Sequence, residues 1–418
     1  MVGKMTEKAN FPALRFKGFT DPWEQRELGE IAKRVTRRND HLESQIPLTI
    51  SAQFGLIRQD EFFDKRIASA NLRNYYLLRQ GELAYNKSTS NDAPWGTVKQ
   101  LTKYESGAVS TLYIVFGLSD RSQSDPSFLT SYYESTKWYF EVSNIAAEGA
   151  RNHGLLNITP DDFFKTTLTI PRSRFEQRKI GLLFDFLNKA LSLHQRKCEK
   201  LQSLKKALLE KMFPSGSSLV PALRLKGFTD PWEQRELSQL CLPVNRKAPI
   251  DSTAPIMMIS STAGFVDQST HYQISNAGSS LQNYTFLKQG ELSYNHGYSK
   301  LRNFGSVFTL RVKEARIPFV YHSFSMPNDE PIFFGHYLNC GIFDKDLRRV
   351  ISSTARMDGL MNISYEEYMS LKVMRPSFSE QKKIGLVLDL LDSAIVLHQR
   401  ECEKLQNLKK ALLEKMFA

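Results

Sequence analysis

One segment of this 418-residue chain occurs twice almost unchanged, and this duplication limits the architecture more than any other feature. Residues 12–28 read PALRFKGFTDPWEQREL, and residues 221–237 read PALRLKGFTDPWEQREL, so that only Phe16 and Leu225 differ. We call these the opening segments. The repetition of this segment predicts that the chain contains two copies of one structural unit.

A second pair of near-identical segments closes each copy. Residues 194–213 read HQRKCEKLQSLKKALLEKMF and return at 398–417 as HQRECEKLQNLKKALLEKMF. An opening segment follows the first of these closing segments, just as the N-terminus would follow the second, so the order of segments is cyclic. The stretches between them are far less alike, which predicts two variable modules on one duplicated frame.

Composition along the chain indicates four parts. The modules are rich in β-branched and aromatic residues, with a strand expected at 113–117, whereas the residues from about 174 to 213 have a helical pattern that Pro214 ends. The predicted boundaries are 1–171 for the first module, 172–214 for the first long helix, 215–376 for the second module and 377–418 for the second long helix.

The two helices carry a coiled-coil pattern in which mostly apolar positions step by four and three residues, and in each helix one of these positions is a lysine. These positions are Leu187, Leu191, His194, Cys198, Leu201, Lys205, Leu208 and Met212, and then Leu391, Ile395, His398, Cys402, Leu405, Lys409, Leu412 and Met416. We interpret the histidines and cysteines among them as packing residues. A helix of about 40 residues measures roughly 60 Å. The predicted fold class is α+β: two mixed α/β modules separated by two long helices that pack as an antiparallel coiled coil with pseudo-twofold symmetry.

The charge balance points to a polyanionic partner. The formal net charge is +12, which favours nucleic acid, although a basic protein without such a partner has the same composition. No run of 18 apolar residues predicts a membrane span, and the first residues lack the apolar core of a signal peptide. The four cysteines form no CxxC pair, which favours a cytoplasmic location and argues against a zinc site.

The two modules differ most in one stretch of constant length. Residues 87–98, KSTSNDAPWGTV, stand opposite residues 296–307, HGYSKLRNFGSV, between segments that match. A loop that keeps its length and changes its side chains can change what a scaffold contacts, although a solvated loop that drifted after duplication would also differ in this way. The candidate DNA-reading residues are Lys87, Ser88, Ser90, Asn91 and Trp95 in the first copy and His296, Tyr298, Lys300, Arg302 and Phe304 in the second.

Further candidates lie in two other shared segments. An arginine near a glycine, Arg151 and Arg356 in the two copies, could hold a phosphate or form a structural ion pair. Weaker candidates come from the segments that begin ISAQFG and ISSTAG, and they are Gln53, Arg58 and Thr262.

Motifs for catalysis are missing from the sequence. It contains no GxxxxGK[ST], no GxGxxG after a strand and no Asn/Asp-Pro-Pro-aromatic motif of amino-methyltransferases. The stretch Asn91–Trp95 resembles the last of these motifs only superficially. The histidines and carboxylates show no metal-ligand spacing, so we expect no catalytic residue, metal or cofactor on this chain.

Three pieces of sequence together resemble specificity subunits of type I restriction–modification systems. They are the opening phrase LRFKGFTDPWEQREL, the module with ISAQFGLIRQDEFF and YNKS, and the helix that runs from EQRKIGLLFDFL to LHQRKCEKLQSLKKALLEKMF. The resemblance covers nearly the whole chain. It implies that the modules are target-recognition domains, each reading one half of a bipartite site in double-stranded DNA, and that the helices fix the gap.

The resemblance also implies partners that carry the chemistry. Two methyltransferase subunits would use S-adenosylmethionine to methylate adenine N6, and restriction–translocation subunits would use ATP and Mg²⁺. Two alternatives stay open from the sequence. One is an interaction scaffold whose modules do not bind DNA, and the other is a divergent methyltransferase that acts alone.

Overall fold

The structure is a computed structural model. It describes residues 10–51, 55–62, 71–91, 93–120, 122–146, 154–214, 218–249, 252–270, 278–299, 302–351 and 361–417. It divides into two compact units, which we describe one at a time. Unit 1 comprises Met1–Arg196 and Gln399–Ala418, and unit 2 comprises Lys197–His398.

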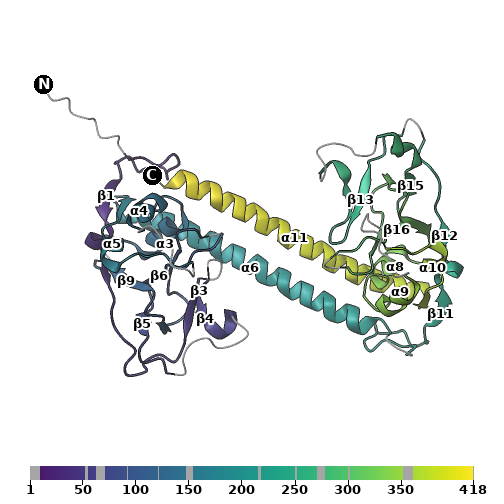
Figure 1. Cartoon of the computed structure of the whole chain (residues 1–418), viewed down its shortest axis with the longest axis horizontal. Helices are drawn as coiled ribbons and strands as arrows, with labels where there is room; N and C mark the ends of the chain where they lie inside the picture. Colours follow the sequence, from purple (N-terminus) through teal and green to yellow (C-terminus); the bar gives the residue numbers. More distant parts are fainter. Residues whose placement is uncertain are drawn as a thin grey trace. The chain divides into compact units, whose positions relative to one another are not determined.

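Unit 1 is built from short antiparallel strands (Figure 1). Its four-stranded sheet has the order β2-β9-β6-β7, and three two-stranded ribbons, β1-β10, β3-β4 and β5-β8, complete the unit. The strands are β1 (Glu24–Glu27), β2 (Ala32–Arg34), β3 (Leu48–Ser51), β4 (Gly55–Arg58), β5 (Tyr76–Arg79), β6 (Leu83–Asn86), β7 (Thr97–Gln100), β8 (Ser106–Val109), β9 (Ile114–Leu118) and β10 (Thr167–Ile170). The strand expected at 113–117 is therefore confirmed as β9, one residue further along.

Unit 2 repeats this plan strand for strand. Its sheet has the order β12-β19-β16-β17, with the ribbons β11-β20, β13-β14 and β15-β18. The strands are β11 (Glu233–Glu236), β12 (Leu242–Pro243), β13 (Met257–Ser260), β14 (Gly264–Asp267), β15 (Thr285–Lys288), β16 (Leu292–Asn295), β17 (Ser306–Thr309), β18 (Glu314–Ile317), β19 (His322–Ser325) and β20 (Lys372–Arg375). The variable modules thus share one topology despite their different sequences.

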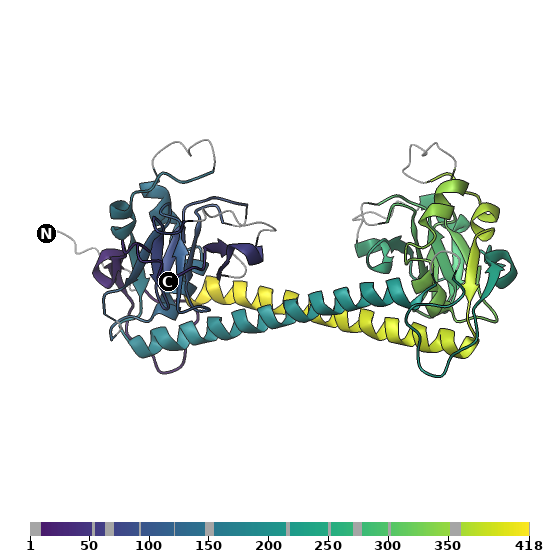
Figure 2. The same cartoon turned by 90° about the horizontal axis from the view of Figure 1, so that it is seen from below.

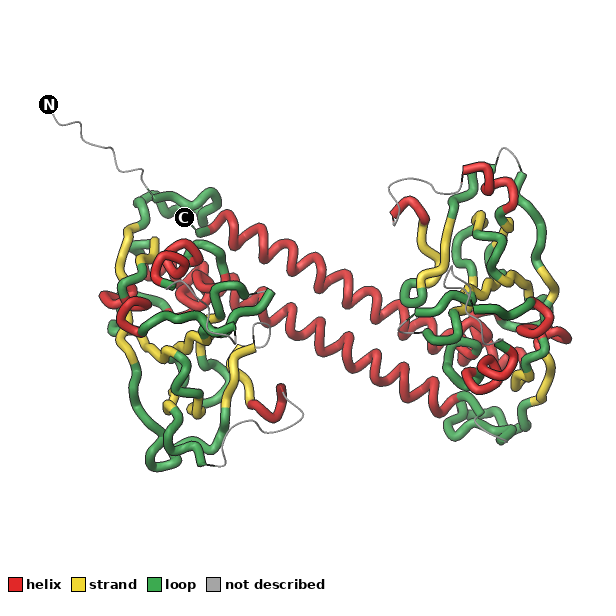
Figure 3. The backbone as a smooth tube through the Cα atoms, in the orientation of Figure 1, coloured by secondary structure: helices red, strands yellow, loops and turns green. Residues whose placement is uncertain are grey.

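Short helices cover these sheets, and one long helix follows the last strand of each module along the chain. The short helices are α1 (Leu28–Ile31), α2 (Gln59–Phe62), α3 (Pro126–Glu134), α4 (Tyr139–Ile145) and α5 (Pro160–Phe164) in unit 1, and α7 (Leu237–Leu240), η1 (Gln268–Thr270), η2 (Gly278–Asn283), α8 (Pro331–Tyr337), α9 (Asp344–Val350) and α10 (Tyr365–Met369) in unit 2. The long helices are α6 (Arg174–Met212) and α11 (Phe378–Met416), each with 39 residues and each unbroken in Figure 3.

The predicted seam of the long helices is confirmed by its burial. Leu187, Leu191, Cys198 and Met212 are buried along α6. Within unit 1 the two helices run in opposite directions, because Lys409 of α11 contacts Asn188 whereas Phe417, just after α11, contacts Phe184. The lysine that interrupts the apolar pattern therefore has a polar partner on the facing helix, an arrangement that fixes register in coiled coils.

The residue that follows α11 completes the core of unit 1. Figure 2 shows the yellow end of α11 within that unit. Phe417 packs edge-on against the buried Trp23 and also contacts Phe128. In unit 2 the buried Phe213, at the end of α6, meets Trp232 in the same edge-on way. The tryptophans of the opening segments are thus core residues of their units.

Backbone contacts confirm that the order of segments is cyclic. In unit 2, Leu223 N donates to Lys211 O at 2.8 Å, across a short connection between closing and opening segments. In unit 1, Leu14 N donates to Lys415 O at the same distance, although these residues lie near opposite ends of the chain. Each opening segment therefore docks on a closing segment, whether or not the chain runs directly from one to the other.

No helix within the described parts of the chain is long and apolar enough to cross a membrane.

Candidate nucleic-acid interface

Each unit presents one hairpin whose loop holds the predicted reading residues. Strands β6 and β7 pair as far as Asn86 and Thr97, and β16 and β17 pair as far as Asn295 and Ser306. The first hairpin loop (87–96) and the second hairpin loop (296–305) consequently have the same length and leave the sheet at the same place. The structure thus holds the variable stretches between equivalent strands.

The base of each loop is fixed by a buried tyrosine. Tyr85 in β6 donates its hydroxyl to the carbonyl oxygen of Trp95 at 2.7 Å, and Tyr294 in β16 donates to that of Phe304 at 2.8 Å. Burial raises the pKa of both tyrosines, so they stay neutral donors. The aromatic residue of each loop is therefore held through its backbone, whatever its side chain is.

A glycine closes each loop for a steric reason. Gly96 has φ +81°, and a Cβ at this position would lie 2.3 Å from the carbonyl oxygen of Asn86. Gly305 has φ +79°, and its Cβ would lie 2.4 Å from the carbonyl oxygen of Asn295. Since neither the conformation nor the space admits a side chain, the glycine that both copies share is a requirement of the turn.

The tips of the loops are also built alike. Ser90 and Ala93 exchange two backbone hydrogen bonds of 3.1 Å, and Ser299 and Arg302 do the same. In the first loop Ser88, Ser90 and Asn91 are exposed. Their hydroxyl and amide groups are of the kind that contacts base edges or phosphates, so the structure leaves these three predicted residues available.

Two predicted residues of the first loop face their own unit instead. Lys87 donates its ammonium group to the carbonyl oxygen of Ile158 at 3.0 Å, and it is only partly exposed. Trp95 is half-buried and packs against the core of unit 1. Both residues therefore contribute to the position of the loop.

His296 is a correction to the predicted reading set. Its side chain is buried, with Nδ1 2.7 Å from the carbonyl oxygen of Met361 and Nε2 2.9 Å from that of Val320. The ring also stacks on His322 at 5.0 Å. A side chain with both nitrogens engaged inside the module cannot reach a base edge, so His296 supports the loop rather than reads DNA.

Among the other predicted residues of the second loop that the structure describes, one is exposed and two contact their own unit. Tyr298 is 65% exposed. Arg302 is half-buried and donates to the carbonyl oxygen of Asn339, and burial lowers the pKa of its guanidinium. Phe304 packs against the core of unit 2, with the guanidinium of Arg348 5.7 Å from its ring centre. Of these three residues, Tyr298 is the one that projects into solvent.

Two weaker candidates lie on a hairpin beside each loop, since β4 contacts β7 and β14 contacts β17. Arg58, at the end of β4, pairs with Asp60 at 2.6 Å, and this carboxylate raises the pKa of the arginine. Thr262 is exposed in the turn between β13 and β14. The remaining predicted residues, Gln53, Arg151, Lys300 and Arg356, lie outside the described residues.

Comparison with known proteins identifies the fold. No protein-family model and no curated protein matches the sequence. The crystal structure of the S subunit of a type I restriction–modification system from M. genitalium is similar over 98% of this chain and 99% of that chain, with 16% identity and a TM-score of 0.63. The chain has the fold of a type I S subunit.

Two further solved structures match over most of their length. One comes from work on complex assembly and conformational transition of the type I R-M system, with 15% identity over 94% of this chain and 97% of that chain, and a TM-score of 0.42. The other is the HsdS subunit from Thermoanaerobacter tengcongensis, with 14% identity over 94% and 96% of the two chains and a TM-score of 0.38.

The two long helices also display a surface that the sequence analysis did not predict. Leu182, Phe186 and Leu193 of α6 are each more than half exposed, at a spacing of four and seven residues that places them on one helix face. Leu386, Leu390 and Leu397 of α11 repeat this pattern. We call these the outer stripes of α6 and α11. The signal was present in the sequence as a second apolar repeat beside the seam.

Across the described parts of the chain, no group of three or more histidine, cysteine, aspartate or glutamate side chains is placed to hold a metal ion.

Proposed function

We propose that this chain is the DNA-recognition subunit of a type I restriction–modification complex. The observation that carries the proposal is the pair of hairpin loops, which have the same length, equivalent backbone hydrogen bonds, the same supporting tyrosines and different exposed side chains. A duplicated frame that holds two different loops suits a bipartite target, with one half read by each module. The S-subunit fold supports this role.

The reading residues we propose are those that remain exposed. They are Ser88, Ser90 and Asn91 in the first module, and Tyr298 with the exposed turn residue Thr262 in the second. Lys300, Arg151, Arg356 and Gln53 stay candidates from the sequence. Phosphate contacts by the basic excess would supply affinity, and the loop residues would supply sequence choice.

The proposed partners would carry the catalytic steps. Two methyltransferase subunits would use S-adenosylmethionine for methylation of adenine N6, and restriction–translocation subunits would use ATP and Mg²⁺. The outer stripes support two equivalent docking sites, because the same apolar positions are exposed on α6 and on α11. Exposed apolar surface of this kind marks sites of protein association.

The test is base-resolution mapping of N6-methyladenine in cells that express this chain together with a neighbouring methyltransferase. We expect a two-part motif with a fixed unread gap that disappears when this chain is deleted. If the complex assembles and no new methylation appears, the scaffold alternative replaces this proposal. If the purified chain alone binds S-adenosylmethionine and methylates DNA, the self-sufficient methyltransferase replaces it.

The stripes provide a separate test of the partners. Phe186→Glu and Leu390→Glu place a charge at equivalent positions of the two stripes. Each variant is expected to lose one of two methyltransferase subunits, as measured from the mass of the purified complex. A complex of unchanged mass in both variants would show that the stripes are not the docking sites.

A further inference from the structure

The first hairpin loop is hydrogen-bonded to residues 154–158, which we call the first support segment. Leu156 N donates to the carbonyl oxygen of Lys87 at 3.0 Å, and Thr89 N donates to that of Gly154 at 2.8 Å. The hydroxyl of Thr89 donates to the same oxygen of Gly154 at 3.0 Å. The start of the loop is therefore attached to another part of its own module at several points.

Side chains at the start of this loop alternate in direction. Lys87 donates its ammonium group to the carbonyl oxygen of Ile158, and Thr89 also contacts the support segment, whereas Ser88 and Ser90 are exposed. Successive side chains of an extended chain point to opposite sides, so the contact that fixes Lys87 also fixes the direction of the serines. A slip of one residue would exchange the two sets.

The second hairpin loop is attached to an equivalent segment, residues 361–363, which we call the second support segment. Met361 N donates to the carbonyl oxygen of His296 at 2.9 Å, which matches the bond between Leu156 and Lys87 in unit 1. In both units this bond joins the first residue of the hairpin loop to the support segment. The described parts of the two support segments therefore correspond residue for residue.

One carbonyl group of each support segment is contacted by a different side chain in the two units. It belongs to Ile158 in unit 1 and to its counterpart Ile363 in unit 2, and both residues are buried. Nζ of Lys87 lies 3.0 Å from the oxygen of Ile158, and Nε2 of His322 lies 3.0 Å from that of Ile363. A buried carbonyl oxygen without a donor costs free energy, so each unit needs a donor at this place.

The neighbouring strand explains why the donors differ. His322 of β19 lies opposite Tyr294, and the residue at the same place in unit 1 is Ile114 of β9, opposite Tyr85. Isoleucine has no side-chain donor, so in unit 1 the loop itself supplies one through a lysine. In unit 2 the first loop residue, His296, stacks instead on His322 with 5.0 Å between the ring centres.

We propose that Lys87 in unit 1, and His296 together with His322 in unit 2, are positioning residues for base reading. This inference rests on the proposed function. These side chains hold each hairpin loop in one register against its support segment, and the exposed side chains of the loop then reach particular base edges. The lysine of unit 1 and the histidine pair of unit 2 are two sets that do the same task, and each set works only as a whole.

The first test removes the ammonium group in unit 1. Lys87→Met keeps a long side chain without the donor, and the complex is examined by base-resolution mapping of N6-methyladenine. Selectivity in one half of the motif is expected to fall about tenfold, which is the discrimination that one base pair supplies, and the other half should stay unchanged. Lys87→Arg keeps a cationic donor and should keep the selectivity. An unchanged motif in Lys87→Met would overturn the proposal.

An exchange in unit 2 tests whether the residues act as a set. His296→Lys alone leaves His322 in contact with Ile363, and it should relax the half of the motif that Lys87→Met leaves intact. The double variant His296→Lys with His322→Ile reproduces the arrangement of unit 1 and should recover most of the lost selectivity. A double variant that is no more selective than the single one would contradict the exchange of whole sets.

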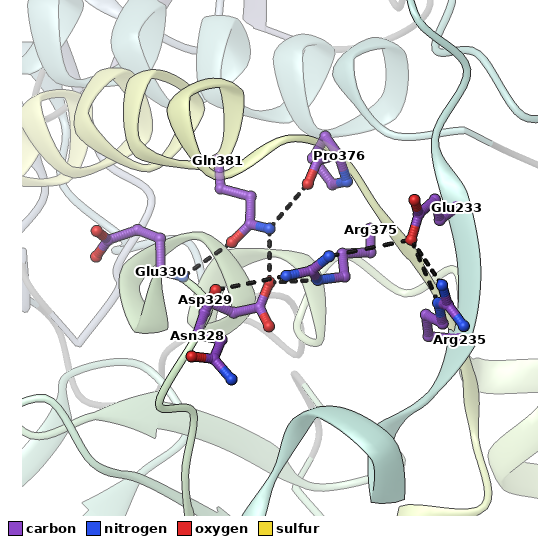
Figure 4. Close-up of polar contacts among 8 residues, drawn as sticks. All are labelled: Glu233, Arg235, Asn328, Asp329, Glu330, Arg375, Pro376 and Gln381. Carbon is purple, nitrogen blue, oxygen red and sulfur yellow. Dashed lines mark hydrogen bonds and ion pairs between the residues drawn. The ribbon is translucent and has the colours of Figure 1, made fainter.

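A control separates position from stability. Figure 4 shows another buried polar network of unit 2, in which Oδ1 of Asp329 accepts from Nε of Arg375 and from Nε2 of Gln381, both at 2.7 Å. Asp329→Asn should weaken unit 2, as measured by hydrogen exchange, and leave both halves of the motif unchanged. If it relaxes the motif as much as His296→Lys does, selectivity follows stability and the proposal fails.

Direct contact of Lys87 with a DNA phosphate is the remaining outcome. Lys87→Met would then lower affinity equally for all sequences and reduce the slope of binding against salt by about one, which would also overturn a positioning role. Absence of any two-part motif with the wild-type chain would count against the proposed function itself. Failure of this inference alone is recognised by a wild-type motif that the variants leave unchanged.

Discussion

Units 1 and 2 each have a lysine at the equivalent position of the helix seam, but the two lysines have different polar partners. In unit 1 Lys409 contacts Asn188 at 2.7 Å and Glu134 at 2.8 Å. In unit 2 the equivalent Lys205 contacts Asp392 at 2.5 Å. Both units thus keep the apolar seam and its lysine, whereas the residues that pair with the lysine differ between the units. Two units of the same shape therefore differ in electrostatics.

The largest expected effect comes from breaking the ion pair that holds each opening segment. Glu176 is buried and accepts from Arg15 at 2.6 and 2.8 Å, and Glu380 accepts from Arg224 at 2.8 Å through both oxygens. Removing one partner of a buried pair costs about 3–5 kcal/mol. Glu176→Ala should destabilise unit 1 and Glu380→Ala unit 2, as measured by hydrogen exchange of peptides from each unit.

The buried glutamate of unit 1 accepts one hydrogen bond that the glutamate of unit 2 lacks. Trp23 donates to Glu176 at 3.4 Å, whereas the indole nitrogen of Trp232 is buried and has no partner in the described residues. The loss in unit 1 should therefore be the greater of the two. Equal losses would mean that the tryptophan contact adds nothing to stability.

Acid should affect the two units over different pH ranges. Burial opposes ionisation of Glu134, but Lys99 and Lys409 outweigh it and lower its pKa from 4.5 to about 2. The unfolded chain takes up this proton at a higher pH than the folded chain, so unit 1 loses about 3 kcal/mol as the pH falls from 4.5 towards 2.

In unit 2 the titrating group is a histidine. Burial and the neighbouring Lys205 lower the pKa of His336 below its usual 6.5, and they outweigh the opposite effect of Asp392 and Asp389. The folded chain keeps His336 neutral while the unfolded chain binds a proton, so unit 2 loses stability as the pH falls below 6.5. Hydrogen exchange measured against pH should show that unit 2 weakens first, and the reverse order would contradict this assignment.

Removing the seam lysine should have unequal effects. Lys409→Ala leaves the carboxylate of Glu134, which is 9% exposed, without one of its two cations, and should cost about 2–3 kcal/mol. Lys205→Ala leaves Asp392, which is 40% exposed, and should cost about 1 kcal/mol or less. Denaturant unfolding followed in each unit tests this difference, and an equal cost would show that burial of the partner does not decide it.

The smallest expected effect is on sequence preference. Tyr298→Ala and Asn91→Ala remove exposed side chains from the second and first hairpin loops and should leave stability unchanged. Each should relax the choice of bases in one half of the methylated motif by about 1 kcal/mol per affected base pair. Motif mapping that shows both halves relaxed by either variant would contradict reading by separate modules.

The sequence predicted the parts of the molecule that depend on local or repeated patterns. The long helices follow from apolar spacing, and the equivalent loops follow from matching segments of constant length. The inward position of His296 could not be predicted, because its partners Val320 and Met361 are 24 and 65 residues away along the chain. The contact of Arg302 with Asn339 is hidden for the same reason. A polar residue in a loop gives no local sign of whether it supports the loop or projects from it.

The cyclic order of segments has a kinetic consequence. Unit 2 closes through a contact between Lys211 and Leu223, which are 12 residues apart along the chain, whereas unit 1 closes through Leu14 and Lys415, near its opposite ends. During synthesis the first module is made early, yet it must wait for Phe417, the residue that fills its core beside Trp23. Contacts between residues far apart along the chain form slowly, and exposed apolar surface promotes aggregation meanwhile. The module that is translated first is therefore expected to finish folding last.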